Sequence, residues 1–148
     1  MSYFKKVAAY GHKKAQYNIG IIYATKWYSK HSFKKAYSVF LDLAQEGYPK
    51  AQNRVGKHLL YGIGVEKDYK MALKWFENAY FKHKYKPAVC NLAVMFANGY
   101  GTLFNFGRAA KLARVGLEDN LPTCKKVYKE FKLEKYKEDK GFKIGYYE

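Results

Sequence analysis

The chain has 148 residues, which is enough for one domain with a continuous core. It carries 28 lysines and arginines against 12 acidic residues, a net charge of +16, and no apolar run long enough to span a membrane. The opening residues lack the apolar stretch of a signal peptide, so we expect a cytoplasmic protein. The charge favours an acidic partner, a nucleic-acid backbone or an anionic surface, with simple solubility as the alternative.

A pattern of small and apolar residues recurs every 36 or 37 residues along the chain. One set of alanines stands at positions 15, 51 and 88, and a second set at 36, 72 and 109. The clearest copy reads Ala-Gln-x-x-Val-Gly at 51–56, Tyr-Gly-x-Gly-Val at 61–65 and Ala-x-x-Trp at 72–75. Self-similarity at this interval predicts an all-α stacked array, in which each helix pair buries its apolar face against its neighbours.

The first part of the chain predicts a cap followed by one helix pair. Residues 3–10 match the end of a second helix, so we expect them to form a capping helix. The first unit, 11–46, is expected to hold helices near 13–26 and 33–46. The residues between them, 26–31, are basic and aromatic instead of glycine-rich.

The second unit, residues 47–82, shows the helix signals most clearly. Apolar and small residues recur at intervals of three and four from Lys50 to Tyr61 and again from 68 to 79, which predicts two helices. Gly62 is expected to end the first helix, since glycine supplies a positive φ angle, and Asp68 is expected to cap the second. Pro49 stands at the head of the first helix, where a missing N–H has no cost.

The last part of the chain predicts a third unit and a closing helix. The third unit, 83–119, is expected to hold helices at 87–98 and 105–117, and proline again stands at the head of the first. A final helix at 122–138 begins with Pro122, and the lysine at position 129 stands where earlier units have a small residue. We therefore expect this helix to close the array as a cap, with a tail at 139–148.

Small side chains at one repeat position predict close helix packing. Gly20, Gly56 and Ala93 would let the first helix of each pair approach the second, with aromatic side chains filling the remaining space. The aromatic content of 19% is therefore assigned mainly to the core.

These motifs resemble the Sel-like repeat (SLR) family, relatives of the tetratricopeptide solenoids. The resemblance rests on Ala-Gln-x-x-Ile/Val-Gly at 15–20 and 51–56 and on Tyr-Gly-x-Gly-Val at 61–65, and it extends over residues 4–135. It implies a right-handed α/α superhelix of about three to four helix-pair repeats, whose first helices line a concave surface that holds other proteins. Family members act as adaptors, and some short bacterial relatives neutralise a toxin.

The tetratricopeptide pattern, mapped onto this sequence, selects candidate residues on the concave face. Tyrosines would act as rigid anchors there and lysines as clamps for acidic groups. An ordinary solvated helix face is the alternative for each of them. The candidates are Lys14, Tyr17, Ile21, Lys50, Asn53, Lys57, Tyr61, Val94, Asn98 and Lys126.

The sequence shows no pattern that predicts catalysis, a metal site or a cofactor site. The four histidines have neither an i, i+4 pair nor an acid at ligand spacing, and the Gly-x-Gly pairs lack the context of a dinucleotide-binding loop. Cys90 and Cys124 are the only cysteines, and their separation of 34 residues suggests two reduced, buried thiols.

We therefore predict a non-enzymatic protein-interaction module that holds an acidic protein in its groove. In the most specific form of this hypothesis, the chain is an immunity protein or inhibitor that blocks a toxin or enzyme. A nucleic-acid-binding solenoid is the alternative, because basic and aromatic residues alternate at 81–86 and 27–31. A host-directed effector or adaptor is the third hypothesis.

Overall fold

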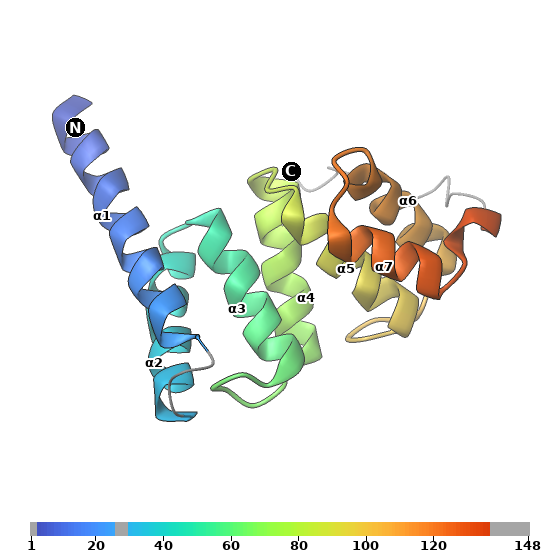
Figure 1. Cartoon of the computed structure of the whole chain (residues 1–148), viewed down its shortest axis with the longest axis horizontal. Coiled ribbons are helices and arrows are strands. Elements are labelled where there is room, and N and C mark those ends of the chain that lie inside the picture. The colour runs from blue at the N-terminus through green and yellow to red at the C-terminus, as the bar shows by residue number, and fades with distance from the viewer. Residues whose placement is uncertain (1–2, 26–29, 137–148) are drawn as a thin grey trace.

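The computed structural model describes residues 3–25 and 30–136, with the side chains of 11–25 and 32–136. The described residues form seven α-helices and no strand (Figure 1). The α-helices are α1 (Tyr3–Tyr23), α2 (Lys30–Gln45), α3 (Pro49–Tyr61), α4 (Tyr69–Glu77), α5 (Pro87–Asn98), α6 (Phe106–Leu117) and α7 (Pro122–Glu130). A π-helical turn, η1 (Asn78–Lys82), continues α4, and a short 3₁₀ helix, η2 (Leu133–Lys135), follows α7.

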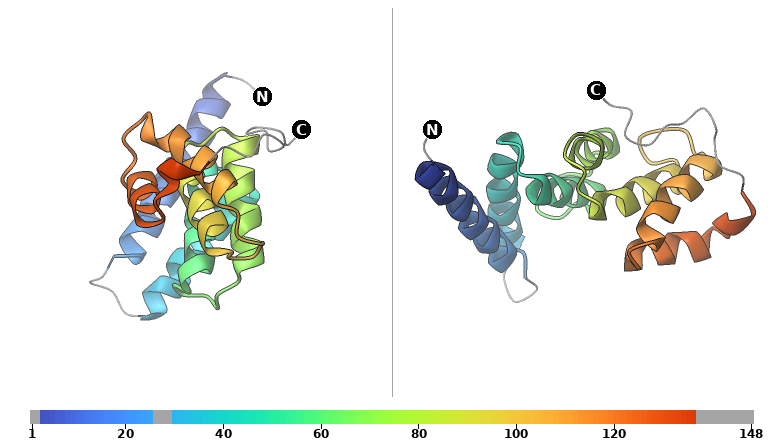
Figure 2. Two further views of the ribbon diagram at one scale, coloured as in Figure 1. Left: turned by 90° about the vertical axis from the view of Figure 1, so that its right-hand side faces the viewer. Right: turned by 90° about the horizontal axis from the view of Figure 1, so that it is seen from above.

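The helices pack as successive hairpins. Within each unit α1 packs on α2, α3 on α4 and α5 on α6, while α2 contacts α3 and α4 contacts α5 across the unit boundaries. The pairs follow one another in a row, with α1 at one end and α6 and α7 at the other (Figures 1 and 2). This arrangement confirms the predicted all-α solenoid.

The N-terminal cap expected at 3–10 is not a separate helix. Helix α1 runs without interruption from Tyr3 to Tyr23. The only weak helix former near the expected boundary is Gly11, and a single glycine lowers helix stability without ending the helix. The cap and the first helix of unit one are therefore the same element.

The closing helix is shorter than expected. Helix α7 ends at Glu130, and Lys132 then adopts a positive φ of 51° that turns the chain into η2. This turn brings Leu133 into the core, where its side chain is fully buried. The turn expected at 26–31 lies largely outside the described residues, and the tail expected at 139–148 lies wholly outside them.

The helix ends follow the signals in the sequence. Pro49, Pro87 and Pro122 each occupy the first turn of their helix, as predicted. The Asp68 carboxylate accepts a hydrogen bond from the Met71 N–H at 3.0 Å, which confirms it as the cap of α4. Gly62, with a φ of 69°, ends α3 in the left-handed conformation that glycine adopts without strain.

The second glycine of each Gly-x-Gly pair connects a unit to the one before it. A Cβ atom on Gly101 would lie 2.7 Å from the carbonyl oxygen of Tyr69, the first residue of α4. A Cβ atom on Gly64 would clash in the same way with the carbonyl oxygen of Phe33 in the first turn of α2. The recurrent glycine therefore lets each loop lie directly on the start of the preceding second helix.

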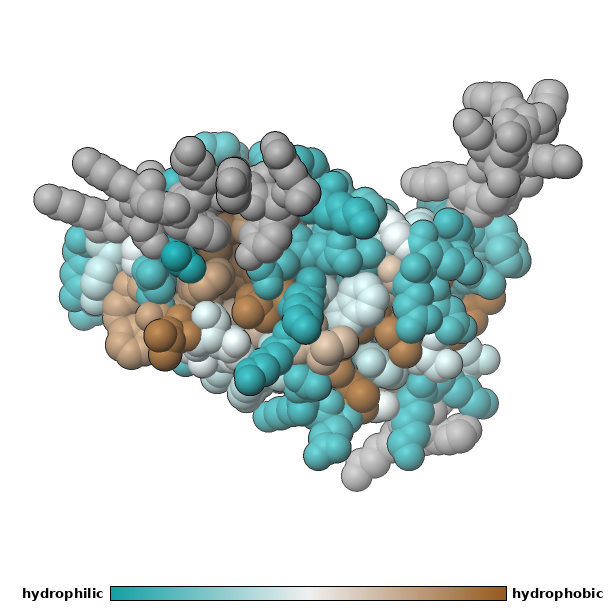
Figure 3. Space-filling model, turned by 180° about the vertical axis from the view of Figure 1, so that it is seen from behind, coloured by the Kyte–Doolittle hydropathy of each residue, from teal (hydrophilic) through white to brown (hydrophobic). Residues whose placement is uncertain are grey.

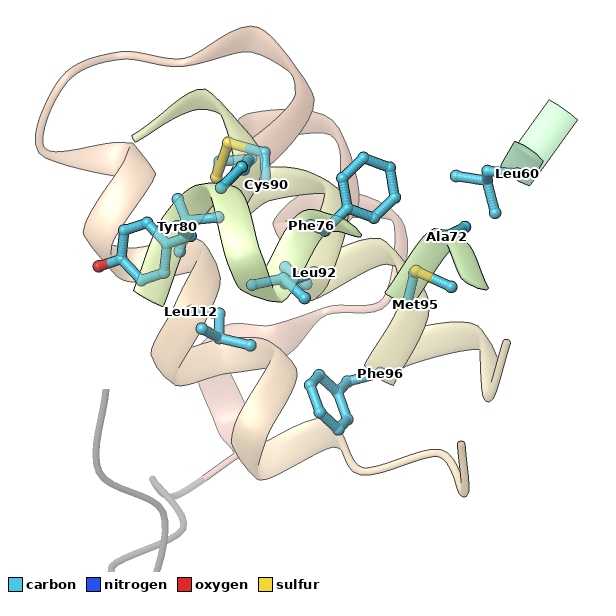
Figure 4. Packing of buried hydrophobic residues seen from close by; sticks show 14 of the residues in the cluster. Leu60, Ala72, Phe76, Tyr80, Cys90, Leu92, Met95, Phe96 and Leu112 are labelled. Carbon is cyan, nitrogen blue, oxygen red and sulfur yellow. A yellow bond between two sulfur atoms is a disulfide. The ribbon is translucent and has the colours of Figure 1, made fainter. Parts of the chain in front are cut away.

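The small residues at 20 and 56 allow the close helix packing that the sequence predicts. A Cβ atom on Gly20 would lie 2.6 Å from the Phe40 ring, and one on Gly56 would lie 2.5 Å from the Phe76 ring. Both rings are fully buried. Figure 4 shows Leu92 between Phe76 and Leu112 in the apolar layer that joins the second unit to the third.

Cys90 and Cys124 form a disulfide, so the expectation of two reduced thiols is wrong. The bond joins α5 to α7, which pack directly against each other, with the two Cα atoms 4.7 Å apart (Figure 4). A separation close to one repeat places two residues on adjacent first helices. A side chain on Gly116 of α6 would clash with both sulfur atoms, so this glycine leaves the space that the disulfide fills.

Candidate functional site

The first helices of successive units are joined by side chains from one repeat position. Tyr17, Asn53 and Cys90 are 36 and 37 residues apart, and each reaches the next first helix. The Arg54 Nε atom donates a hydrogen bond to the Tyr17 hydroxyl at 3.0 Å. The Asn91 amide donates to the Asn53 side-chain oxygen at 2.9 Å, and Cys90 bonds covalently to Cys124. We call these three contacts the rungs; they link α1 to α3, α3 to α5 and α5 to α7. We call the surface formed by these four first helices the wall.

Two predicted partner-binding residues are used by these rungs. Asn53 is only 9% exposed, so its side chain is not available to a partner. Tyr17 is half-buried, with its ring centroid 5.5 Å from that of Phe40 and 5.8 Å from that of Tyr48. The structure therefore places Asn53 inside the wall and gives Tyr17 a packing role.

A recess of about 770 Å³ opens where the ends of α1 and α3 meet the start of α2. Most of its lining surface is apolar. Among its charged residues, three are cationic and one is acidic. The main lining residues are Ala24, Phe33, Lys34, Arg54, Lys57, His58, Ile63, Val65 and Glu66.

Lys57 is the one predicted site residue in this recess, and its environment is unusual for a lysine. Burial, and then the positive charge of Arg54, lower the pKa of the Lys57 ammonium. Within the described part of the chain, neither Lys57 nor Arg54 has a carboxylate at ion-pair distance. A half-buried cation without a counter-charge is stabilised by any anion that enters the recess.

His58 fixes the wall of the recess. Its Nδ1 atom lies 2.8 Å from the Ile63 carbonyl oxygen, and because a carbonyl can only accept, Nδ1 carries the hydrogen. Burial lowers the pKa of the imidazole, Arg54 and Lys57 lower it further, and the hydrogen bond to Ile63 opposes them. A neutral His58 therefore holds the 62–66 loop against the end of α3.

The other predicted residues are spread along the first helices. Lys14, Lys50, Tyr61 and Lys126 are exposed, while Ile21 and Val94 are half-buried against the core. Asn98 is exposed and donates a hydrogen bond to the Val94 carbonyl at 2.8 Å. Helical spacing puts Lys50, Lys57 and Tyr61 on one face of α3, and Lys57 is the half-buried residue of the three.

Sequence reasoning missed Lys34, Arg54 and Glu66. Arg54 follows the predicted Asn53 directly, and the contact of its repeat equivalent Asn91 with Asn53 shows that this position faces the wall. Lys34 and Glu66 gave no such signal, because they reach the recess only through the packing of the 62–66 loop on the first turn of α2.

The described residues contain no cluster of histidine, cysteine and acidic side chains that could hold a metal ion. None of the helices in this part of the chain is both long and apolar enough to cross a membrane. The face shown in Figure 3 is mostly hydrophilic, with apolar residues in small separate areas.

Comparison with known proteins agrees with this architecture. The family model described as Sel1 repeat matches residues 49–80 and 86–114, the second and third helix pairs. Protein sel-1 homolog 2 of Mus musculus is 32% identical over 110 residues, and that of Rattus norvegicus is 33% identical over the same length. Each match covers 72% of this chain but 16% of the relative, so the chain corresponds to a small part of those proteins.

Two solved structures share the fold. One is a protective antigen present in uropathogenic Escherichia coli strains and displaying an SLR fold, with a TM-score of 0.73, 26% identity, and coverage of 88% of this chain and 28% of that one. The other is a Sel1 repeat protein from Oxalobacter formigenes, with a TM-score of 0.65, 25% identity, and coverage of 82% and 48%. With its repeated helix pairs, its Gly-x-Gly loops and these matches, the chain belongs to the Sel1 repeat family.

Proposed function

We propose that this chain binds an acidic protein along the wall of its first helices, without catalysing a reaction. Sel1 repeats are generally protein-interaction modules. The observation that carries the acidic character of the partner is the recess in which Lys34, Arg54 and Lys57 outnumber Glu66.

The energetics of this recess favour a carboxylate from a partner. Hydrogen bonds to charged groups contribute roughly 1.5–3 kcal/mol, more than neutral ones. Lys57 is already partly desolvated in the free protein, so much of the cost of removing water is met before binding. The net charge of +16 also speeds the encounter with a negatively charged protein.

In its narrower form, the proposal is that the partner is a toxin or enzyme that this chain inhibits. Inhibition needs only a surface that covers the partner's active site, and a partner bound along the wall of first helices would be covered in this way. The cytoplasmic location stays a prediction, and the Cys90–Cys124 disulfide weighs against it because disulfides persist mainly in oxidising compartments.

Of the two motifs behind the nucleic-acid alternative, the 81–86 segment has aromatic rings that are buried or half-buried. Phe81, expected to stack on a base, is only 2% exposed, and Tyr85 is half-buried against the core. The second motif, at 27–31, lies largely outside the described residues. Stacking platforms must present the faces of their rings, so the 81–86 segment does not support single-strand binding. No structural observation favours the effector hypothesis.

A charge-matched pair of variants tests the proposed binding surface. The wall variant carries Lys14→Gln, Lys50→Gln and Lys57→Gln. The control carries Lys70→Gln, Lys74→Gln and Lys82→Gln, three exposed lysines of α4 and η1. Each variant loses three of the 16 net positive charges, so a general charge effect acts on both equally.

Each variant and the wild type are used to capture proteins from the native host, and captured proteins are identified and their isoelectric points compared. We expect the wild type and the control to retain an acidic protein that the wall variant loses. Equal retention by all three, or loss from both variants alike, would show that the wall is not the binding surface. A captured partner with a basic isoelectric point would contradict the acidic assignment.

A further inference from the structure

The outer face of α1 is exposed where the equivalent faces of the other first helices are buried. Ile19 and Ile22 are 48% and 52% exposed. Their repeat equivalents are buried in both later units: Val55 and His58 on α3, Leu92 and Met95 on α5. In those units the preceding second helix covers this face, since α2 packs on α3 and α4 on α5.

Helix α2 contributes the other half of this end of the molecule. A shallow hollow of about 180 Å³ lies between the two helices, lined by Gln16, Ile19, Val39 and Asp42. We call the surface formed by Lys13, Ile19, Ile22, Val39, Asp42 and Glu46 the end face. Figure 1 shows α1 as the outermost helix of the row.

The end face differs from the rest of the N-terminal half in its charge. Asp42 and Glu46 are the only acidic residues among the first 65, and both belong to the end face. Lys13 lies at the same height as Glu46, with its Nζ atom 3.7 Å from the Glu46 Oε2 atom. In a chain with a net charge of +16, this is a place where two copies can meet without strong repulsion.

We propose that the end face is a self-association surface, on which two copies of this chain meet about a two-fold axis that runs between α1 and α2, parallel to both helices. Rotation about such an axis preserves height along the helices and places α1 of each copy on α2 of the other. The facing helices then run antiparallel, as α2 and α3 do inside the molecule. Apolar contact between Ile19 of one copy and Val39 of the other extends the packing of the solenoid.

The same symmetry pairs the charges between copies. Because Lys13 and Glu46 are level within one copy, Lys13 of each copy comes level with Glu46 of the other. Two equivalent ion pairs therefore form at one height along the helices, next to the apolar contact. The arrangement is isologous and closes at two copies.

The opposite end of the molecule does not offer a matching surface. Within the described residues α7 is followed only by the short η2, and its Cys124 and Val127 are already buried where α7 packs on α5 and α6. Its exposed positions include Lys125, Lys126 and Lys129. None of the large apolar side chains that are exposed in the described part of the chain belongs to α7. A head-to-tail contact would therefore give Ile19 and Val39 no apolar partner, so the end face pairs with itself.

Sedimentation equilibrium of the wild type and two single variants gives the first test. We expect a mass approaching twice 17.3 kDa for the wild type as concentration rises, and 17.3 kDa for Ile19→Lys. Leu103→Lys is the matched control, since Leu103 is 89% exposed in the α5–α6 loop, and it should associate like the wild type. A wild type that remains monomeric at all concentrations, or equal association of all three proteins, would overturn the proposal.

A charge exchange tests the symmetry itself. Lys13→Glu places two acids level with each other across the interface, and Glu46→Lys places two lysines there, so each variant alone should be monomeric. A mixture of the two should form a heterodimer, because each copy then supplies the charge that the other requires. Circular dichroism of the separate variants checks that both are folded. No heterodimer from folded variants would contradict the two-fold arrangement.

Discussion

Residue size at a single position sets how closely the helices of a unit approach. Gly56 lies against the fully buried ring of Phe76, and Gly20 against Phe40. In the third unit the equivalent positions are held by Ala93 and Ala113, so a glycine–phenylalanine pair gives way to two alanines. In the third unit the side chain on the first helix is larger and the one on the second helix is smaller, so the two helices can still pack closely.

Gly56→Ala is expected to destabilise the fold by about 1–3 kcal/mol, despite the higher helix propensity of alanine. The added Cβ would lie 2.5 Å from the ring of Phe76, which is fully buried, so the ring would have to shift within the core. Gly11→Ala is the control, because its Cβ would have no neighbour within 4 Å, and it should stabilise α1 by roughly 0.5–1 kcal/mol. Urea unfolding measures both, and a neutral or stabilising Gly56→Ala would refute the packing argument.

His58 should make the free energy of unfolding depend on pH. Burial lowers the pKa of its imidazole in the folded protein, while in the unfolded chain it titrates near its ordinary value of about 6.5. Protons therefore bind preferentially to the unfolded chain as pH falls below about 6.5, and stability decreases. His58→Asn keeps a donor for the Ile63 carbonyl without titrating, so its stability should vary less over this range. Parallel pH profiles for the two proteins would contradict the assignment.

At the scale of helices, the rungs show that side chains at one repeat position can join successive first helices through three different kinds of interaction. A tyrosine–arginine contact, an asparagine pair and a disulfide join successive first helices. In a solenoid each unit is stabilised by its nearest neighbours, so each rung acts mainly on its own pair of units.

Removal of the disulfide should therefore loosen the C-terminal end selectively. Reduction, or Cys90→Ala with Cys124→Ala, is expected to cost roughly 2–4 kcal/mol of stability. Amide hydrogen exchange should increase most in α7 and least in α3. A uniform increase along the chain, or none, would show that the disulfide does not act through the contact between α5 and α7.

The helix pairs and the close packing positions could be predicted from sequence because they depend on local and repeated signals. Proline, Asp68 and Gly62 mark helix ends, and the 36-residue interval aligns Gly20 with Gly56. The disulfide was mispredicted because distance along the chain was taken for distance in space. Gly116, whose missing side chain makes room for both sulfurs, was the available clue.

The residues that line the recess were predicted less well, since the recess depends on contacts between units. The helical spacing selected Lys57, which lines the recess, but it also selected Asn53, which is buried in its contact with Asn91. The recess needs the 62–66 loop to fold back on α2, and nothing local in the sequence of Lys34 or Glu66 indicates this contact.

At the scale of the whole molecule, the wall of first helices and the end face are separate surfaces of one solenoid. Lys57 and Arg54 lie in the recess between the first two units, whereas Ile19 and Val39 lie on the outer side of the first unit. A dimer formed through the end face would leave both recesses open. The two proposals can therefore fail independently.

Amide hydrogen exchange of the chain bound to the acidic protein it retains tests the central claim most directly. The account predicts slower exchange in the first helices α1 and α3 and in the 62–66 loop, with little change in α4 and α6. Protection confined to α4 and α6, with α3 and the 62–66 loop unchanged, would contradict the claim that partners bind to the wall of first helices.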